Sequence, residues 1–335
     1  MNNRERVVAA LNHRQPDKTP YNIDFTQAAH AKMADYYGDP RFADRLGNCL
    51  TVTSCEPRDS WKEVAPDIWE DQFGVQWNRA VDKDIGVVCN RVVAPETLGA
   101  LQLPDPDDPS RYAHYPRLIA DKKQDSFIVV DLGFSLFERA WTLAGMENVL
   151  MWMVEDKGLI HRLLDVIVEF NLRVIDHVCA YDVDAMLFGD DWGQQRGVIM
   201  GPRLWREFVK PCVRRMYGAV HARGKHVFIH SCGKVDELFP DLIECGVNMF
   251  NPFQPEVIDV YDVKRRYGRD LGFYGGISTQ RTLPYGTVQE TKDEVRRLID
   301  AIGKDGGYIA SPAHAIPADA KPENIAAMIE VLQNQ

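Results

Sequence analysis

Short apolar runs alternate with amphipathic segments through the second half of the chain. The runs predict strands at residues 184–189, 226–230, 247–251, 271–274 and 308–310. The segments that follow them predict helices at residues 202–220, 235–244, 257–267, 288–302 and 322–333. Short, continuously apolar runs that end at Gly, Asp, Asn or Pro are typical of parallel strands buried on both faces. Five successive strand–helix units indicate either a doubly wound sheet or a (β/α)8 barrel.

The first half of the chain follows the same pattern less regularly. It predicts helices at 4–12, 136–143 and 148–181 and strands at 21–25 and 127–131. Residues 69–89 are typical of hairpins, and one more barrel strand is expected between residues 32 and 117. No repeat, low-complexity tract or linker divides the sequence. We therefore predict a single α/β domain over residues 1–335, a (β/α)8 TIM-type barrel with N-terminal helical and hairpin additions.

Composition narrows the class of protein. The 335 residues are 45% hydrophobic and 26% charged, as in ordinary globular proteins. The net charge of -10 and the lack of a basic run argue against a nucleic-acid partner. No apolar stretch is long enough to span a bilayer, and the polar N-terminus does not resemble a signal peptide. Seven widely spaced cysteines fit a reducing compartment, so we expect a cytoplasmic protein without a membrane partner.

Polar residues that follow the predicted strands are the candidates for chemistry, because barrel active sites lie at the C-terminal ends of the strands. We take four aspartates as catalytic candidates: Asp24, Asp131, Asp190 and Asp191. We take four further residues as candidates for substrate binding: Asn251, Gln254, Ser278 and Gln280. Asp24 and Asp131 could be general acids, substrate hydrogen-bond acceptors or loop stabilisers. Asp190 and Asp191 could contact substrate or accept from a ligand imidazole N–H, or could cap a helix or turn.

A His-x-Cys pair ends the strand at 226–230 and is the most specific of these features. Side chains two residues apart share a face of a strand, so His230 and Cys232 point the same way. An imidazole and a thiolate can provide two of the three protein ligands of an open zinc site, and His314 after the last strand is the third candidate. Cys245 is a rival third ligand. The alternative for Cys232 is a cysteine that packs as a small hydrophobic residue.

Several segments, spread over nearly the whole chain, resemble the uroporphyrinogen decarboxylase superfamily. They are Arg4–His13 with Pro16-Asp17, His230-Ser231-Cys232-Gly233, Asn251-Pro252-Phe253-Gln254, Tyr274–Gln280 and Ser311–Pro317. The resemblance implies a barrel and two known activities. One branch decarboxylates a porphyrinogen without a metal, and another transfers methyl groups between zinc-activated substrates and corrinoid proteins.

Two differences from the decarboxylase branch favour the methyltransferase branch. The decarboxylases hold their polycarboxylate substrate with an Arg-Gln-Ala-Gly-Arg segment, whereas residues 21–29 of this chain contain no arginine. The methyltransferases resemble this chain at His230 and Cys232, although their third ligand is usually a cysteine where this chain has His314. Because the decarboxylases also have a histidine near that position, Cys232 is the residue that distinguishes the branches.

The resemblance implies a zinc-dependent methyltransferase. Its substrate would be a small methoxy or methyl compound, as in O-demethylation, or a thiol. The corrinoid (cobalamin) would be carried by a separate partner protein, because the chain has no Asp-x-His-x-x-Gly corrinoid signature. The resemblance also allows a homodimer. The alternatives are a metal-free decarboxylase or lyase that acts on a carboxylated substrate and a non-catalytic, ligand-binding barrel.

Overall fold

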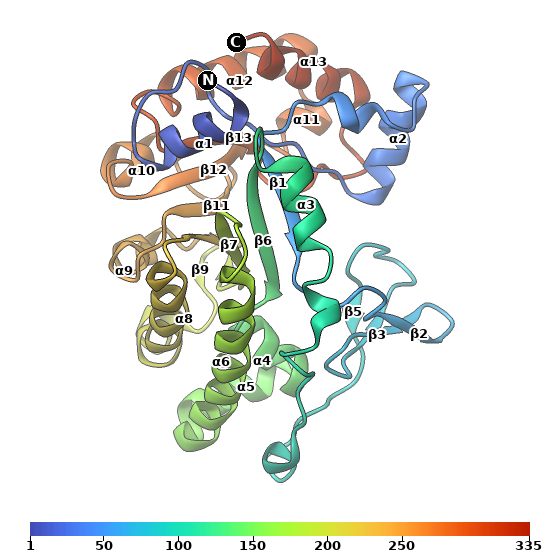
Figure 1. Ribbon diagram of the computed structural model, residues 1–335, viewed down its shortest axis with the longest axis vertical. Coiled ribbons are helices and arrows are strands. Elements are labelled where there is room, and N and C mark those ends of the chain that lie inside the picture. Colours follow the sequence, from blue (N-terminus) through green and yellow to red (C-terminus); the bar gives the residue numbers. More distant parts are fainter.

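A curled parallel sheet forms the centre of the structure, a computed structural model that describes residues 1–335 (Figure 1). Its seven strands lie in the order β1 (Leu50–Ser54), β6 (Phe127–Phe134), β7 (Ala185–Gly189), β10 (His226–His230), β11 (Met249–Phe253), β12 (Gly272–Ile277) and β13 (Tyr308–Pro312). All neighbouring pairs in this sheet are parallel. The predicted TIM-type barrel is confirmed, and β1 is the strand that was expected between residues 32 and 117.

The eighth position of the barrel is filled by residues 20–25, between β13 and β1. The Asn22 N–H donates to the Ala310 carbonyl at 3.0 Å, and the Cys49 N–H donates to the Tyr21 carbonyl at 2.9 Å. The prediction of a regular strand here was wrong, because only single bridge pairs form, such as Tyr21 with Ala310. The Asn48 side chain explains the irregularity, since its amide bonds both the N–H and the carbonyl of Ile23 in place of a neighbouring strand.

Apolar side chains fill the N-terminal half of the barrel interior. Phe127, Phe228, Met249 and Ile309 point inward from four strands, and helix α1 (Asn3–Leu11) closes that end of the barrel with Val7 and Leu11. Because side chains alternate along a strand, His230 shares the inward face with Phe228 but lies one layer closer to the C-terminal end. The open end of the barrel is therefore the end that carries the candidate polar residues.

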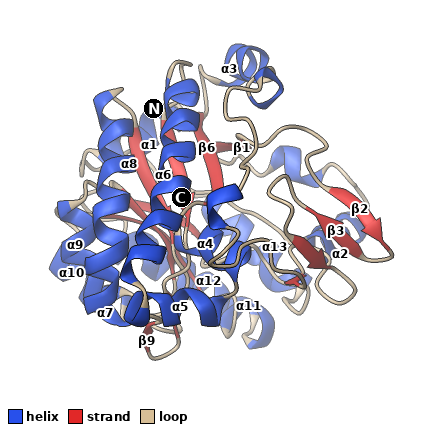
Figure 2. Ribbon diagram, turned by 90° about the horizontal axis from the view of Figure 1, so that it is seen from below, coloured by secondary structure: helices blue, strands red, loops and turns tan.

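Helices cover the outside of the barrel (Figures 1 and 2). They are α4 (Phe137–Ala144), α5 (Met146–Glu155), α6 (Lys157–Cys179), α8 (Lys210–Ala222), α9 (Phe239–Glu244), α10 (Val260–Tyr267), α12 (Val288–Ala301) and α13 (Pro322–Gln333). The helix expected over 148–181 is two helices, because Asp156 leaves the helical conformation and caps α6 by accepting from the Leu159 N–H. The helix expected over 202–220 comprises α7 (Gly201–Leu204), a π-helical turn at Trp205–Val209, and α8.

The sequence pattern did not predict several elements. They are helices α2 (Gln27–Tyr37), α3 (Tyr115–Lys122) and α11 (Thr282–Tyr285) and the hairpin β8 (Gly193–Gln194) and β9 (Gly197–Val198). No helix combines the length and the apolar composition that a membrane crossing requires.

The expected hairpins form a small antiparallel sheet at one side of the barrel (Figure 2). It contains β2 (Lys62–Ala65), β3 (Ile68–Glu70), β4 (Gln76–Asn78) and β5 (Val87–Val88). Trp77 of β4 is buried and stacks on Phe134 at the C-terminal end of β6, with ring centroids 5.3 Å apart. This contact fixes the small sheet beside the open end of the barrel.

Candidate functional site

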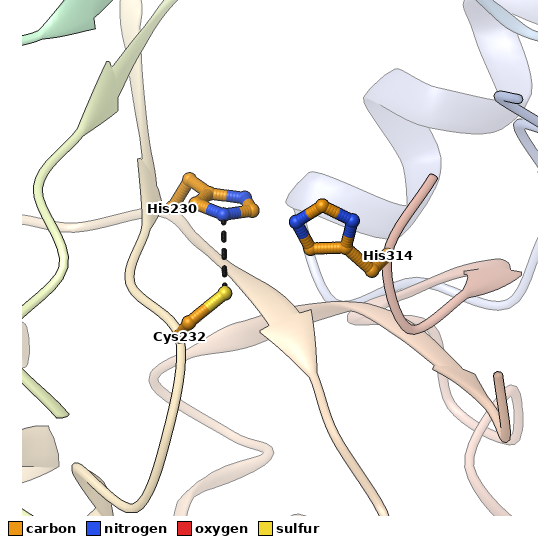
Figure 3. A group of neighbouring side chains, drawn as sticks. All are labelled: His230, Cys232 and His314. Atoms are coloured by element: carbon orange, nitrogen blue, oxygen red, sulfur yellow. Dashed lines mark hydrogen bonds between the residues drawn. The ribbon is translucent and has the colours of Figure 1, made fainter. Parts of the chain in front are cut away.

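Three side chains from the ends of two strands converge at the open end of the barrel (Figure 3). His230 is the last residue of β10, Cys232 lies two residues further, and His314 follows β13. One donor atom of each lies within 4.8 Å of the other two. Cys232 Sγ is 3.5 Å from His230 Nε2, and the two imidazole rings meet edge to face with centroids 5.6 Å apart. These distances leave room for one ion among three donors.

The loop that carries Cys232 is held by hydrogen bonds from both sides. The Cys232 N–H donates to Asp191 Oδ1 at 2.7 Å, and the Gly233 N–H donates to Gln254 Oε1 at 2.8 Å. Gly233 has a φ of +85°, and a Cβ there would lie 2.5 Å from the backbone of Gly193. Glycine is therefore required at position 233 by its conformation and by the close approach of the β8 strand.

Asn251 fixes the orientation of the His230 ring. Asn251 Nδ2 donates to the Tyr274 carbonyl at 3.0 Å, which turns Oδ1 toward His230 Nδ1 at 2.6 Å. A carboxamide oxygen can only accept, so Nδ1 carries the proton and Nε2 keeps its lone pair. Nε2 is the atom that faces Cys232. Metal-binding histidines are usually held in this way through their second ring nitrogen.

A cavity of about 770 Å³ opens beside the two histidines. It is lined by 24 residues, among them the predicted site residues Asp24, Asp131, Asp191, Asn251, His230 and His314. These side chains come from the closing segment 20–25, from β6, β10 and β11, and from the loops after β7 and β13. The barrel thus brings together six predicted residues that are distant in sequence.

The four candidate aspartates occupy different environments. Burial raises the pKa of Asp24 and of Asp131, and both line the cavity. Asp191 also lines it and has its Oδ1 4.0 Å from His230 Nε2. Asp190 has no exposed surface and does not line the cavity.

Asp190 serves the packing of the barrel. Its carboxylate accepts from the Glu138 N–H at 2.8 Å, from the Leu136 N–H at 3.3 Å and from Trp192 Nε1 at 2.6 Å. Burial raises the pKa of Asp190 to about 6. The carboxylate joins the end of β7 to the start of α4, and we therefore leave it out of the reacting groups.

Of the four candidates for substrate binding, one lines the cavity and three lie outside it. Asn251 lines the cavity, whereas Gln254, Ser278 and Gln280 do not. Gln254 and Ser278 are buried in loops, where Gln254 bonds Gly233 and the Ser278 hydroxyl donates to Glu256 Oε1 at 2.5 Å. Gln280 is exposed. The rival ligand Cys245 is buried and does not join the group around His230.

Sequence reasoning missed Glu138 and Tyr274, which both line the cavity. Glu138 lies in the first turn of α4 and is only 7% exposed. Burial and the charges of Asp191 and Asp190 raise its pKa. The sequence did contain a signal for Glu138. It is a carboxylate two residues after the expected helix start at 136, close to the end of a barrel strand. Tyr274 receives a hydrogen bond from Asn22 Nδ2 at 3.0 Å.

The donor set fits a zinc ion. Burial, together with the charges of Asp191 and Glu138, raises the pKa of the Cys232 thiol, so the thiol keeps its proton without a cation. Burial and the neighbouring His230 lower the pKa of His314, which favours the neutral imidazole that binds metals. Two imidazoles and a thiolate form a ligand set that catalytic zinc sites use, with a fourth position left for substrate.

Comparison with known proteins places this chain in a family. Residues 71–335 match the family described as uroporphyrinogen decarboxylase (URO-D). The chain belongs to this family. Among curated relatives, it is 22% identical over 179 residues to a methylated-thiol–coenzyme M methyltransferase of Methanosarcina mazei, covering 53% of this chain and 47% of the relative. It is 21% identical over 188 residues to a methylcobamide:CoM methyltransferase of Methanosarcina barkeri, covering 56% and 52%.

The chain is also similar to decarboxylases. The chain is 22% identical over 248 residues to a uroporphyrinogen decarboxylase of Shewanella halifaxensis, covering 70% of this chain and 67% of the relative. The chain spans about half the length of the two methyltransferases. Among solved structures, a methyltransferase from Methanosarcina mazei superposes with a TM-score of 0.76 at 17% identity, covering 100% of this chain and 99% of the other. At this identity, the superposition establishes the shared fold.

Proposed function

We propose that this protein is a zinc-dependent methyltransferase. It would move a methyl group between a small methoxy or methyl substrate, or a thiol, and a corrinoid carried by a separate protein. The observation that carries the proposal is the convergence of His230, Cys232 and His314 beside a cavity that the two histidines line. The similarity to two methyltransferases supports the same reaction class.

The three donors would hold zinc and leave one position for substrate. Zinc would supply a Lewis acid at the substrate oxygen or sulfur. Asn251 would keep Nε2 of His230 available for the metal, and Asp191 would hold the Cys232 backbone through the bond at 2.7 Å. The ligands are thus oriented by neighbours, which favours a preformed site.

Two aspartates that line the cavity are our candidates for proton transfer. When the methyl group leaves an ether, the substrate oxygen keeps the electron pair of the broken bond and needs a proton. Desolvation at the cavity wall raises the pKa of Asp24 and of Asp131, so each holds a proton to a higher pH than an aspartate in bulk water. We infer that one of them acts as the general acid for an oxygen substrate, or accepts the proton of a thiol.

A corrinoid protein would dock over the open end of the barrel. The 770 Å³ cavity is large enough for a small substrate and opens to solvent. A transient complex of this kind needs only a modest interface, at the low end of the range for specific complexes. The same opening would admit the substrate before the partner binds.

A metal-free decarboxylase is the second candidate, because the alignment with a uroporphyrinogen decarboxylase covers 70% of this chain. The cavity argues against it, since no arginine or lysine is among its lining residues. A polycarboxylate would find no cation there, and like charges brought together in an interface cost several kcal/mol.

Metal analysis tests the proposal directly. We expect about one zinc per chain in the purified protein and a loss of zinc in Cys232→Ala. Cys89→Ala is the matched control, because Cys89 is exposed in the small sheet and should leave the zinc content unchanged. A folded wild-type protein that binds no zinc when zinc is supplied would overturn the proposal and favour the metal-free lyase.

A further inference from the structure

Apart from His230 and His314, the charged side chains that line the cavity are all acidic. Its 24 lining residues include five carboxylates and no lysine or arginine. The carboxylates are Asp24, Glu56, Asp131, Glu138 and Asp191. In the whole chain, 39 basic residues accompany 49 acidic ones, so the absence of basic residues is a property of this cavity.

The carboxylates of the cavity lack cationic partners from the protein. Asp24, Glu56, Asp131 and Glu138 form no ion pair with any lysine or arginine within 4.0 Å. Arg139, which follows Glu138 in α4, pairs instead with the buried Asp71 at 2.9 Å. No lysine or arginine of the protein therefore pairs with these four carboxylates.

Neutral donors engage only part of each carboxylate. Asp24 Oδ1 accepts from the Phe25 N–H at 2.9 Å, and Asp131 Oδ1 accepts from the Gly133 N–H at 2.8 Å. Glu56 Oε2 accepts from Trp61 Nε1 at 3.2 Å. In each carboxylate the second oxygen has no protein donor. Because all three residues line the cavity, these oxygens remain available to a ligand.

Glu138 is the most informative of the five. It is more than nine-tenths buried and lies on the cavity wall without a cation. A buried charge is costly unless it is paired, and a positive charge nearby favours the ionised carboxylate. No lysine or arginine forms an ion pair with Glu138, and its pKa is raised; a cation bound in the cavity would favour its ionised form. Zinc with one bound thiolate would add a single net positive charge against five carboxylates.

We propose that the substrate of this cavity carries a positive charge, as a protonated amine does, in addition to the oxygen or sulfur atom that reaches zinc. This inference rests on the proposed function and names its substrate class. The carboxylates attract cations and repel anions before contact and after binding. A preference for a positively charged substrate would distinguish this protein from one that binds a sulfonate or a polycarboxylate in the same place.

Three thiols of equal length test the inference. They are 2-aminoethanethiol, 2-mercaptoethanol and 2-mercaptoethanesulfonate, which present a cation, a neutral hydroxyl and an anion on the same two-carbon thiol. Binding to the zinc-loaded protein is measured by calorimetry at fixed salt. Methyl transfer from free methylcobalamin to each thiol is followed separately. In that transfer the thiolate sulfur takes the methyl group, the thiol proton is released, and the electron pair of the carbon–cobalt bond stays on cobalt.

We expect the ammonium thiol to bind about a hundredfold more tightly than the sulfonate, with the hydroxyl compound between them. Equal or tighter binding of the sulfonate would overturn the inference and leave the proposed function intact. If no thiol binds to the zinc-loaded protein, the inference is overturned for a thiol substrate, and the zinc analysis of wild type and Cys232→Ala remains the separate test of the proposed function.

Variants that replace one carboxylate with an amide show which residues produce the preference for the ammonium thiol. Asp131→Asn and Glu138→Gln should each reduce the preference for the ammonium thiol over the sulfonate about tenfold, because each removes one carboxylate from the wall. Glu96→Gln is the matched control, since Glu96 is exposed outside the cavity and the substitution makes the same change in net charge. An unchanged preference in both cavity variants would overturn the inference even if the wild type prefers the cation.

Discussion

Asn251 holds His230 in the tautomer that leaves Nε2 free. The carboxamide oxygen lies 2.6 Å from Nδ1, while the carboxamide nitrogen donates to the Tyr274 carbonyl at 3.0 Å. His230 and Asn251 are paired in register on neighbouring strands, so the barrel itself sets this contact. The residue that the sequence suggested as a substrate contact therefore has a second role, which is to position a candidate metal ligand.

Replacement of Asn251 should weaken zinc binding. We expect Asn251→Ala to lower the zinc affinity about tenfold to a hundredfold, because the His230 ring loses the acceptor that fixes it. Asn251→Asp keeps an acceptor for Nδ1 and should retain more of the affinity than the alanine variant. Competition with a chromophoric chelator measures both. Wild-type affinity in Asn251→Ala would show that the contact does not orient a ligand.

Removal of zinc should abolish methyl transfer and preserve the fold. The 78-residue apolar cluster that forms the main core contains none of the three proposed ligands, so circular dichroism should change little on chelation. Added zinc should restore activity and raise the melting temperature, since a ligand at one hundred times its Kd stabilises the native state by about 2.7 kcal/mol. Full activity of the metal-free protein would contradict the mechanism.

Asp190 and Asp131 should affect different properties. Asp190→Ala leaves the N–H groups of Leu136 and Glu138 without their buried acceptor, and we expect a loss of about 1–3 kcal/mol of stability. Its zinc content per folded chain should remain normal. Asp131→Ala should instead lower kcat with a smaller loss of stability, because Asp131 lines the cavity. Urea unfolding and single-substrate kinetics on both variants separate the two roles.

Asp184 should make the stability of the barrel depend on pH. Burial acts to raise its pKa, but hydrogen bonds from Arg4, Lys123 and the Ile128 N–H outweigh this and lower it. A lowered pKa in the folded state means that the stabilisation is complete above the unfolded value of about 3.9 and is lost as pH falls through the folded value.

Asp184→Asn should therefore cost about 2 kcal/mol at pH 7 and progressively less below pH 4. Urea unfolding at several pH values measures the difference from the wild type. Asp182→Asn is a suitable control, because Asp182 pairs with the same Lys123 at 3.1 Å but is 68% exposed. A constant difference between wild type and Asp184→Asn from pH 7 to pH 2 would contradict this assignment.

The elements with a strong local pattern could be predicted from the sequence. The strand expected at 226–230 is β10, and helix 322–333 is α13 at its predicted bounds. Continuous apolar runs are the signature of strands buried on both faces, and this signature does not depend on distant residues. The segment 20–25 differs, because the amide of Asn48 replaces part of a backbone ladder. When a side chain replaces the hydrogen bonds of a neighbouring strand, the sequence shows no periodic pattern from which this arrangement could be predicted.

The sequence by itself determined the barrel class and the likeness of His230, Cys232 and His314 to a zinc ligand set, because strand periodicity and residue chemistry are local properties. Only the tertiary structure decided which polar residues share the cavity. Gln254, Ser278 and Gln280 follow barrel strands but lie in loops outside it, whereas Glu138 reaches it from a helix. Side-chain direction after a strand depends on loop packing, and the charge of a cavity depends on which side chains the fold brings together.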